Sequence, residues 1–389
     1  MAGSLTGVFV SLFLYISGGR ILAMALYNLG VYVGIAVMSV WAAGQRHGVG
    51  PRRLLAVGVA LTAAQYVVLL ALGAYADRVV LPLGLLAGVA GGVYWFAMNT
   101  LRYDLVGPRE RFLYYGTSQA LTAAAGVALP LVGGLVISRL RHGLGYHVVF
   151  AAALVAYLTA LVVVRGLPEG HAVGGLPVGD ALRLARERPR FRRLALALGI
   201  EGLRDVTGGF VLVALTYLAT RSAGGLALYT AAAALAGALG ALLLRRVRDE
   251  RARAAMWLGA SVSVAASLVM VPWGPALGLF TAFQVVTAFS APLYRIPIAT
   301  RLLAVMDEDP AAARTRGSYV LGQEIAIAGG RLVAVGAMLA LVALLPLWTA
   351  LALGTAAVAL AQVGAVALAA STTVHSAGSP AGAVGAHGG

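Results

Sequence analysis

Two groups of ionisable side chains lie inside long apolar stretches of this sequence. Glu201, Arg204 and Asp205 are spaced i, i+3 and i+4, so all three would share one face of a helix. Glu324 and Arg331 are seven residues apart and would share one face of another helix. A charge at the centre of a lipid bilayer costs at least about 2.5–3.5 kcal/mol, so such residues face a cavity or one another. These five residues are therefore candidates for binding a solute or a proton.

The carboxylates admit two interpretations. A carboxylate removed from water can bind and release a proton at physiological pH. Three carboxylates against two arginines leave one negative charge in excess, which predicts that at least one of Glu201, Asp205 and Glu324 binds a proton. The alternative is a structural ion pair that joins the two helices. Gln119 corresponds to Glu324 in the internal repeat described below, which predicts a polar cavity charged mainly on its C-terminal side.

Three further polar residues are candidates for contacting a solute. Asn28 lies in the outer half of the second apolar stretch, where a helix–helix hydrogen bond is the commoner role for such a residue. Tyr94 and Asn99 belong to an aromatic segment at the end of the fourth stretch, where aromatic residues more often anchor a helix at the membrane interface.

The composition defines the elements that position these side chains. Of the 389 residues, 60% are hydrophobic and only 11% are charged, which is too little polar surface for a water-soluble globule. Apolar runs of about 20 residues, enough to cross a bilayer as a helix, recur along the whole chain. Because lipid offers the backbone no hydrogen bonds, and because no run alternates as a barrel strand would, these runs must be helices. The predicted fold class is all-α, a polytopic membrane protein.

We predict about twelve membrane helices in two six-helix halves. The first half is 1–165, and a linker with a basic interfacial helix follows at 166–193. The second half is 194–370, and 371–389 is a disordered tail. The predicted helices are 4–18, 22–43, 54–74, 79–99, 113–138, 145–165, 194–219, 225–245, 254–272, 275–296, 317–343 and 345–370.

All 29 basic residues are arginines, and they are unevenly distributed. The loops after the second, fourth, sixth, eighth and tenth helices carry 22 of them, against five in the loops on the opposite side. Positive charge marks the cytoplasmic side, so we predict a cell-membrane protein with both termini cytoplasmic. This topology accounts for the net charge of +15 without a nucleic-acid partner. The chain has no cysteine, and we expect neither a metal nor a cofactor.

An internal repeat relates the two halves. At an offset of 202 residues, Tyr15 and the Ala-Leu-Tyr triplet 25–27 fall on Tyr217 and 227–229. Further along the chain the offset is 205, which places 109, 111 and 114 on 314, 316 and 319, and Gln119 on Glu324. Two parallel six-helix halves are typical of the major facilitator superfamily, which this chain resembles. The offset also places the start of the first helix before Met1, so we expect that helix to be truncated.

The loop after the second helix resembles the superfamily signature Gly-x-x-x-Asp-Arg-x-Gly-Arg-Arg/Lys. In that family the loop ties the two halves together on the cytoplasmic face through charge pairs. Here Gln45 replaces the aspartate and two residues are inserted before the last arginines, so an ordinary positively charged loop is the alternative. The gating candidates in this loop are Gly44, Arg46, Gly48, Arg52 and Arg53.

The fifth helix resembles the Gly-Pro-x-x-Gly-Gly pattern of proton antiporters in the same superfamily. Leu129 stands where the first glycine of that pattern would be. A proline bends the helix and small residues allow close packing, so ordinary helix contact is the alternative. The residues of this second set of gating candidates are Gly126, Pro130, Gly133 and Gly134.

The chain also resembles an uncharacterised bacterial branch of the superfamily. The likeness is carried by 94–104, 109–111, 202–205, 323–325 and 330–331. It implies a monomeric secondary transporter that moves a small organic solute across the lipid bilayer by alternating access. We expect proton coupling, and efflux rather than uptake.

Two other functions remain open. A transporter-fold sensor that has lost transport would fit the altered signature loop. An integral-membrane transferase would need paired acidic metal sites, whereas the single acidic run Asp307-Glu308-Asp309 is interpreted as a solvated turn, so we do not expect an enzyme.

The predicted topology can be tested by cysteine labelling, because the chain has no cysteine of its own. We expect Gly174→Cys to remain unlabelled when intact cells are treated with a membrane-impermeant thiol reagent, and to be labelled after the cells are broken. Labelling from outside intact cells would contradict the orientation.

Overall fold

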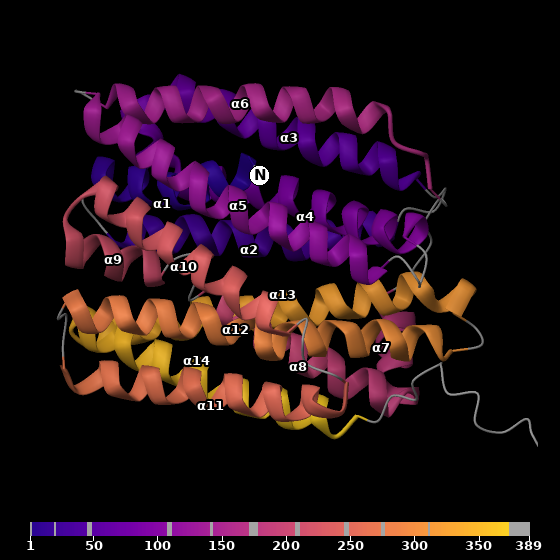
Figure 1. Ribbon diagram of the computed structural model, residues 1–389. Helices are drawn as coiled ribbons and strands as arrows, with labels where there is room; N and C mark the ends of the chain where they lie inside the picture. The colour runs from indigo at the N-terminus through magenta and orange to yellow at the C-terminus, as the bar shows by residue number, and fades with distance from the viewer. Residues whose placement is uncertain are drawn as a thin grey trace, which may run out of the picture.

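The computed structural model consists of long α-helices that lie side by side in two groups, one from each half of the chain (Figure 1). It describes residues 2–18, 21–44, 49–106, 111–140, 143–170, 178–206, 211–244, 249–273, 277–309 and 312–372. Eight segments of these residues are long and apolar enough to cross a membrane, and one of them, Pro51–Arg102, contains two consecutive helices. The predicted all-helical fold class is confirmed.

Within the described residues, the first half of the chain forms six α-helices, coloured indigo to magenta in Figure 1. Their apolar residues cover all faces, because lipid and a neighbouring helix are equally acceptable surroundings. A short 3₁₀ helix, η1 (Gly73–Val79), joins the third to the fourth. The bounds are α1 Ala2–Gly18, α2 Ile21–Ala43, α3 Pro51–Leu72, α4 Val80–Leu105, α5 Arg111–Arg139 and α6 Leu144–Arg165.

The rest of the chain forms the linker helix α7 and the helices of the second half. The predicted seventh helix corresponds to α8 and α9, and residues 207–210 between them lie outside the described part. The tail from 373 and the segment 171–177, with Gly174, also lie outside it. The bounds are α7 Val178–Glu187, α8 Pro189–Val206, α9 Leu212–Thr220, α10 Ala223–Leu244, α11 Asp249–Trp273, α12 Leu277–Asp307, α13 Ala312–Leu344 and α14 Leu347–Ala370.

The tenth membrane helix is longer than predicted. α12 continues to Asp307 although it contains Pro292 and Pro297. Proline is tolerated inside a membrane helix because neighbouring helices and local adjustments satisfy the freed backbone groups. Arg295 and Arg301, which were counted with the loop arginines, are therefore helix residues.

The linker helix α7 packs its apolar side on the protein. Ala181 and Leu184 are buried in a core cluster with residues of the second half. On the exposed side, Arg183 pairs with Asp180 and Glu187 of the same helix, at N–O distances of 3.3 and 3.9 Å. Contact of this exposed side with lipid headgroups stays a prediction.

The linker connects the two halves at one end of the helix bundle, and we call this end the linker end. It contains the end of α6, the start of α8 and the loops that precede α3 and α13. Arg52 at the start of α3 pairs with Glu169 just after α6, and Arg188 before α8 pairs with Asp309 after α12. The topology prediction assigns this end to the cytoplasm.

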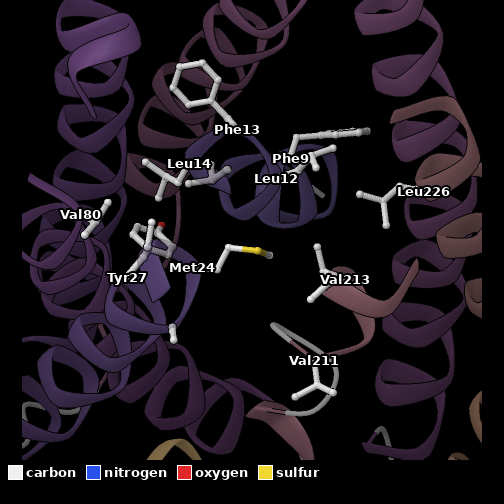
Figure 2. Packing of buried hydrophobic residues seen from close by; sticks show 14 of the residues in the cluster. Phe9, Leu12, Phe13, Leu14, Met24, Tyr27, Val80, Val211, Val213 and Leu226 are labelled. Atoms are coloured by element: carbon white, nitrogen blue, oxygen red, sulfur yellow. The ribbon is translucent and has the colours of Figure 1, made fainter. Parts of the chain in front are cut away.

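At the opposite end, the two halves meet through residues that the repeat makes equivalent. The rings of Tyr15 (α1) and Tyr217 (α9) lie edge to face, with centroids 5.5 Å apart and planes inclined by 71°. Figure 2 shows Phe9 of α1 on one side of this apolar contact and Val213 and Leu226 of the second half on the other. The pseudo-symmetry axis therefore passes close to the tyrosine pair.

Helices α8 and α13, which carry the candidate charges, touch backbone to backbone at glycines. A Cβ atom added to Gly330 would overlap the carbonyl oxygen of Gly199, and one added to Gly202 would overlap that of Ile327. Only glycine permits this approach, which fixes the register of α8 against α13.

We expect Gly330→Ala to lower the melting temperature of the purified protein, because the added methyl group must push α8 away from α13. Overpacking of this kind costs about 1–3 kcal/mol. The neighbouring Gly329 is a matched control, because a Cβ atom there would meet no atom within 4 Å. Gly329→Ala should leave stability unchanged or raise it, and equal melting temperatures for the two variants would contradict the close contact.

Candidate functional site

The candidate charges lie at similar depths in the second half of the protein. Glu201 is twelve residues into α8, Glu324 is twelve residues into α13, and Arg295 is twelve residues before the end of α12. These helix ends all belong to the linker end. At a rise of about 1.5 Å per residue, each residue lies about 18 Å from that end, close to the middle of a bilayer.

Asp205 is held by two arginines from neighbouring helices. The Nε and Nη2 atoms of Arg331 both donate to Oδ2 of Asp205, at 3.0 and 2.6 Å. The Nη2 atom of Arg295 lies 3.8 Å from Oδ1. Charge-assisted contacts of this geometry stabilise the ionised carboxylate. The predicted alternative, an ion pair joining the two helices, is confirmed for Asp205 and Arg331.

Arg295 is the site residue that sequence reasoning missed. Its Nε atom lies 3.1 Å from Oε2 of Glu201, so it contacts both carboxylates of α8. Three arginines therefore accompany three carboxylates, and the predicted excess of negative charge is wrong. The predicted helix 275–296 ends directly after Arg295, which places this arginine at the helix end with the loop arginines. The buried residues Ile298, Leu302 and Val305 continue the apolar pattern past Pro297, and this signal would have placed Arg295 well inside a helix.

Glu324 has a different kind of partner. Its side chain is buried, and its Oε1 atom accepts a hydrogen bond of 2.9 Å from Nδ2 of Asn99. Asn99 lies on α4, so this bond joins the first half of the protein to the second. No arginine of the described residues lies within 4 Å of the Glu324 carboxylate.

A second polar contact between the halves lies beside this bond. The hydroxyl of Tyr32 on α2 donates to the backbone carbonyl oxygen of Asp205, at 3.3 Å. The guanidinium carbon of Arg331 lies 5.7 Å from the centroid of the Tyr32 ring. The site thus contains groups from both halves, and its charged residues all come from the second.

Glu201 and Arg204 have the fewest hydrogen-bond and ion-pair partners of the group among the described residues. Glu201 is 5% exposed, and neither carboxylate oxygen has a hydrogen bond of good geometry, although Arg295 is close. Arg204 is half-buried and lies within electrostatic range of Glu201. No described residue forms an ion pair or a hydrogen bond with the Arg204 guanidinium.

Two predicted site residues are not brought to this cluster, and the side chain of a third lies outside the described residues. Asn28 is buried and donates to the carbonyl oxygen of Met24 in its own helix, at 2.8 Å, so the observed bond is not the expected helix–helix one. Tyr94 packs against Gly58 on α3 and against Trp95, with ring centroids 5.3 Å apart. The side chain of Gln119 lies outside the described residues.

The signature loop reaches the linker through its last arginines. Arg52 and Arg53 both pair with Glu169, and Arg52 also donates to the carbonyl oxygen of Leu167 at 3.1 Å. Glu169 thus supplies a carboxylate to a loop that lacks its own aspartate. Gly44 ends α2 in an exposed turn. Arg46 and Gly48 lie outside the described residues.

The glycine pattern of α5 packs across the boundary between the halves. A Cβ atom at Gly134 would overlap that of Ala227 on α10, and one at Gly126 would lie 3.1 Å from that of Ala234. Gly133 faces Phe9 on α1 instead. Pro130 lies inside α5, between these contacts.

The acidic run at the end of α12 is a solvated turn only in part, because Asp307 and Glu308 are exposed and Asp309 is not. Asp309 is buried and accepts hydrogen bonds from Arg188, Thr315 and Tyr319, at 3.2, 3.3 and 3.0 Å. Glu308 pairs with Arg190 on α8 at 2.9 Å. The run therefore ties the start of α8 to the start of α13. Within the described residues, no three His, Asp or Glu side chains converge as a metal site would require.

The sequence matches the family model of the Major Facilitator Superfamily over residues 2–330. An uncharacterised protein of Bacillus subtilis, YqgE, is 26% identical over 334 residues, which is 85% of this chain and 77% of that protein. An uncharacterised protein encoded in the sodM 3' region of Geobacillus stearothermophilus is 34% identical over 149 residues, 38% of this chain and 70% of that protein.

Solved transporter structures share the fold at low sequence identity. The Escherichia coli fucose:proton symporter FucP superposes with a TM-score of 0.65 at 13% identity, covering 95% of this chain and 94% of that one. A bacterial homologue of the iron transporter ferroportin, in an inward-facing state, gives 0.64 at 14% identity, with coverages of 95% and 97%. Human MFSD10, an organic anion transporter, gives 0.56 at 19% identity, with coverages of 94% and 82%.

We expect Arg331→Gln to lower the melting temperature markedly, because it leaves the Asp205 carboxylate short of its two closest donors. Losing one partner of a buried pair costs about 3–5 kcal/mol, and partial exposure of this pair should reduce that figure. The double variant Asp205→Asn/Arg331→Gln should recover part of the loss. Arg183→Gln, which removes an exposed cation of α7, is the control and should change little. Additive effects of the two substitutions would contradict a direct pair.

Proposed function

We infer the activity of this chain from one premise: it belongs to the major facilitator superfamily and is a secondary transporter. We propose that it moves a small organic solute out of the cytoplasm by alternating access, in exchange for protons. We further propose that Glu324 binds the transported proton.

The observation that carries this proposal is the hydrogen bond between Glu324 and Asn99. The two residues lie on different halves, and alternating access moves one half against the other. When the halves separate at this point, the carboxylate loses its neutral donor and gains access to water. Its affinity for a proton would then differ between the two states, which is what coupling requires.

The other carboxylates are less suited to this role. Asp205 is fixed by Arg331 within the second half, and this pair can remain intact when the halves move. Glu201 has Arg295 at 3.1 Å, also within the second half. A carboxylate in contact with a cation is stabilised in its ionised form. Glu324 differs, because Arg331 acts on it only from beyond ion-pair distance. We therefore narrow the predicted coupling site from three carboxylates to Glu324.

The direction of transport rests on α5. Its glycine pattern resembles that of proton antiporters, and Gly126 and Gly134 lie against α10 of the other half. Small residues on both sides allow the two helices to slide or rock without overlap, and Pro130 supplies a bend. This placement supports exchange of a solute for protons.

We expect Glu324→Gln to fold and to retain downhill solute movement, while its flux no longer responds to an imposed pH gradient. The neutral amide keeps the size of the side chain and can still bond to Asn99, but it cannot bind a proton. The measurement uses proteoliposomes and a solute found by thermal-shift screening of the purified protein. Glu187→Gln removes an exposed carboxylate of α7 and should keep the pH response.

Glu201→Gln and Asp205→Asn complete the test. The proposal is wrong if Glu324→Gln keeps full pH-driven flux, or if all three substitutions lower the melting temperature together. Absence of flux for every bound solute would instead favour a sensor.

A further inference from the structure

We infer that the transported solute carries an anionic group, a carboxylate or similar, which binds to Arg204 and Arg295. This inference rests on the proposed transport function and adds the chemical class of the solute. It follows from how the three arginines of the site are partnered.

Arg331 and Arg295 have carboxylate partners, whereas Arg204 has none among the described residues. Arg331 is bound to Asp205 through two nitrogen atoms, and Arg295 lies between Glu201 and Asp205. Arg204 is half-buried, one turn of α8 beyond Glu201. A guanidinium cannot lose its proton in a protein, so it stays charged in this apolar region. Glu201 lies within electrostatic range of this charge but forms no ion pair with it, so the guanidinium donors of Arg204 have no partner among the described residues and can bind an anionic solute.

Arg295 supplies a second guanidinium for the same anion. Its side chain is 47% exposed although the residue lies well inside α12, so neighbouring residues do not enclose it completely. Its contact with Asp205, at 3.8 Å, is long and leaves donor capacity. A planar guanidinium matches the two oxygens of a carboxylate, which is why arginine suits this group better than a single point charge would.

The anion site and the proton site are separate groups. Arg204 and Arg295 lie on α8 and α12 beside Glu201, whereas Glu324 lies on α13 and bonds to Asn99 of the other half. Substitutions can therefore abolish anion binding and proton binding independently of each other. An anionic solute also fits efflux, because the inside-negative membrane potential drives anions out of a cell.

The test is a thermal-shift screen of the purified protein with sets of three compounds that share a carbon skeleton. Benzoate, benzylamine and benzyl alcohol form one set, and hexanoate, hexylamine and hexanol form another. We expect the carboxylates to raise the melting temperature and the amines and alcohols to leave it unchanged. We expect the rise to be lost in Arg204→Gln and kept in Arg183→Gln, which removes an exposed cation of α7. Selective stabilisation by amines or alcohols, or no rise with any carboxylate, would overturn the inference.

The ligand-free protein gives a second readout that does not depend on the choice of compounds. Because the Arg204 guanidinium has no ion pair to lose among the described residues, Arg204→Gln should melt at or above the wild-type temperature. Arg331→Gln should melt well below it. A fall in Arg204→Gln as large as that in Arg331→Gln would show that Arg204 is a structural residue, and would overturn the inference.

This inference and the proposed proton coupling fail in different ways. Carboxylate binding without a pH response in wild-type flux would overturn only the coupling. Amine-selective binding with an intact pH response would overturn only the anion site.

Discussion

The cost of ionised groups in an apolar bundle is the constraint on which this structure depends. Every charge at mid-depth must be matched by another charge, by a hydrogen-bond donor or by a ligand. Asp205 meets this requirement with Arg331 and Arg295, and Glu324 meets it with Asn99. The close glycine contacts between α8 and α13 hold these partners at the distances that they need. The close packing of the two helices therefore keeps the charged groups of the site within reach of their partners.

The boundary between the halves is built from three different kinds of contact. Aromatic rings meet at Tyr15 and Tyr217, small residues meet between α5 and α10, and polar groups meet at Asn99 and Glu324. Within each half, the links at the linker end are ion pairs and buried hydrogen bonds, such as those of Asp309. This division suits two rigid halves that move against each other, because the contacts at the boundary are individually weak and can be exchanged.

The fold by itself does not identify the solute. FucP, named as a fucose:proton symporter, and a homologue of the iron transporter ferroportin share the architecture at 13–14% identity. The identity of the solute must therefore be argued from side chains rather than from topology. In this chain our proposal of an anionic solute rests on the arrangement of Arg204, Arg295 and Glu201.

Much of the architecture follows from sequence alone, because lipid forces long apolar runs into helices and a repeat aligns two halves. The one-face spacing of Glu201, Arg204 and Asp205 could likewise be read from helical geometry. The sequence does not show which of these residues pair with one another, because pairing depends on how helices far apart in the chain pack together. The predicted helix ends at 296, directly after Arg295, so the sequence alone groups this arginine with the loops and leaves it out of the charge balance of the site. Only the tertiary structure placed Asn99 against Glu324 and left Arg204 without a described partner, since side chains 225 residues apart meet only when the two halves dock.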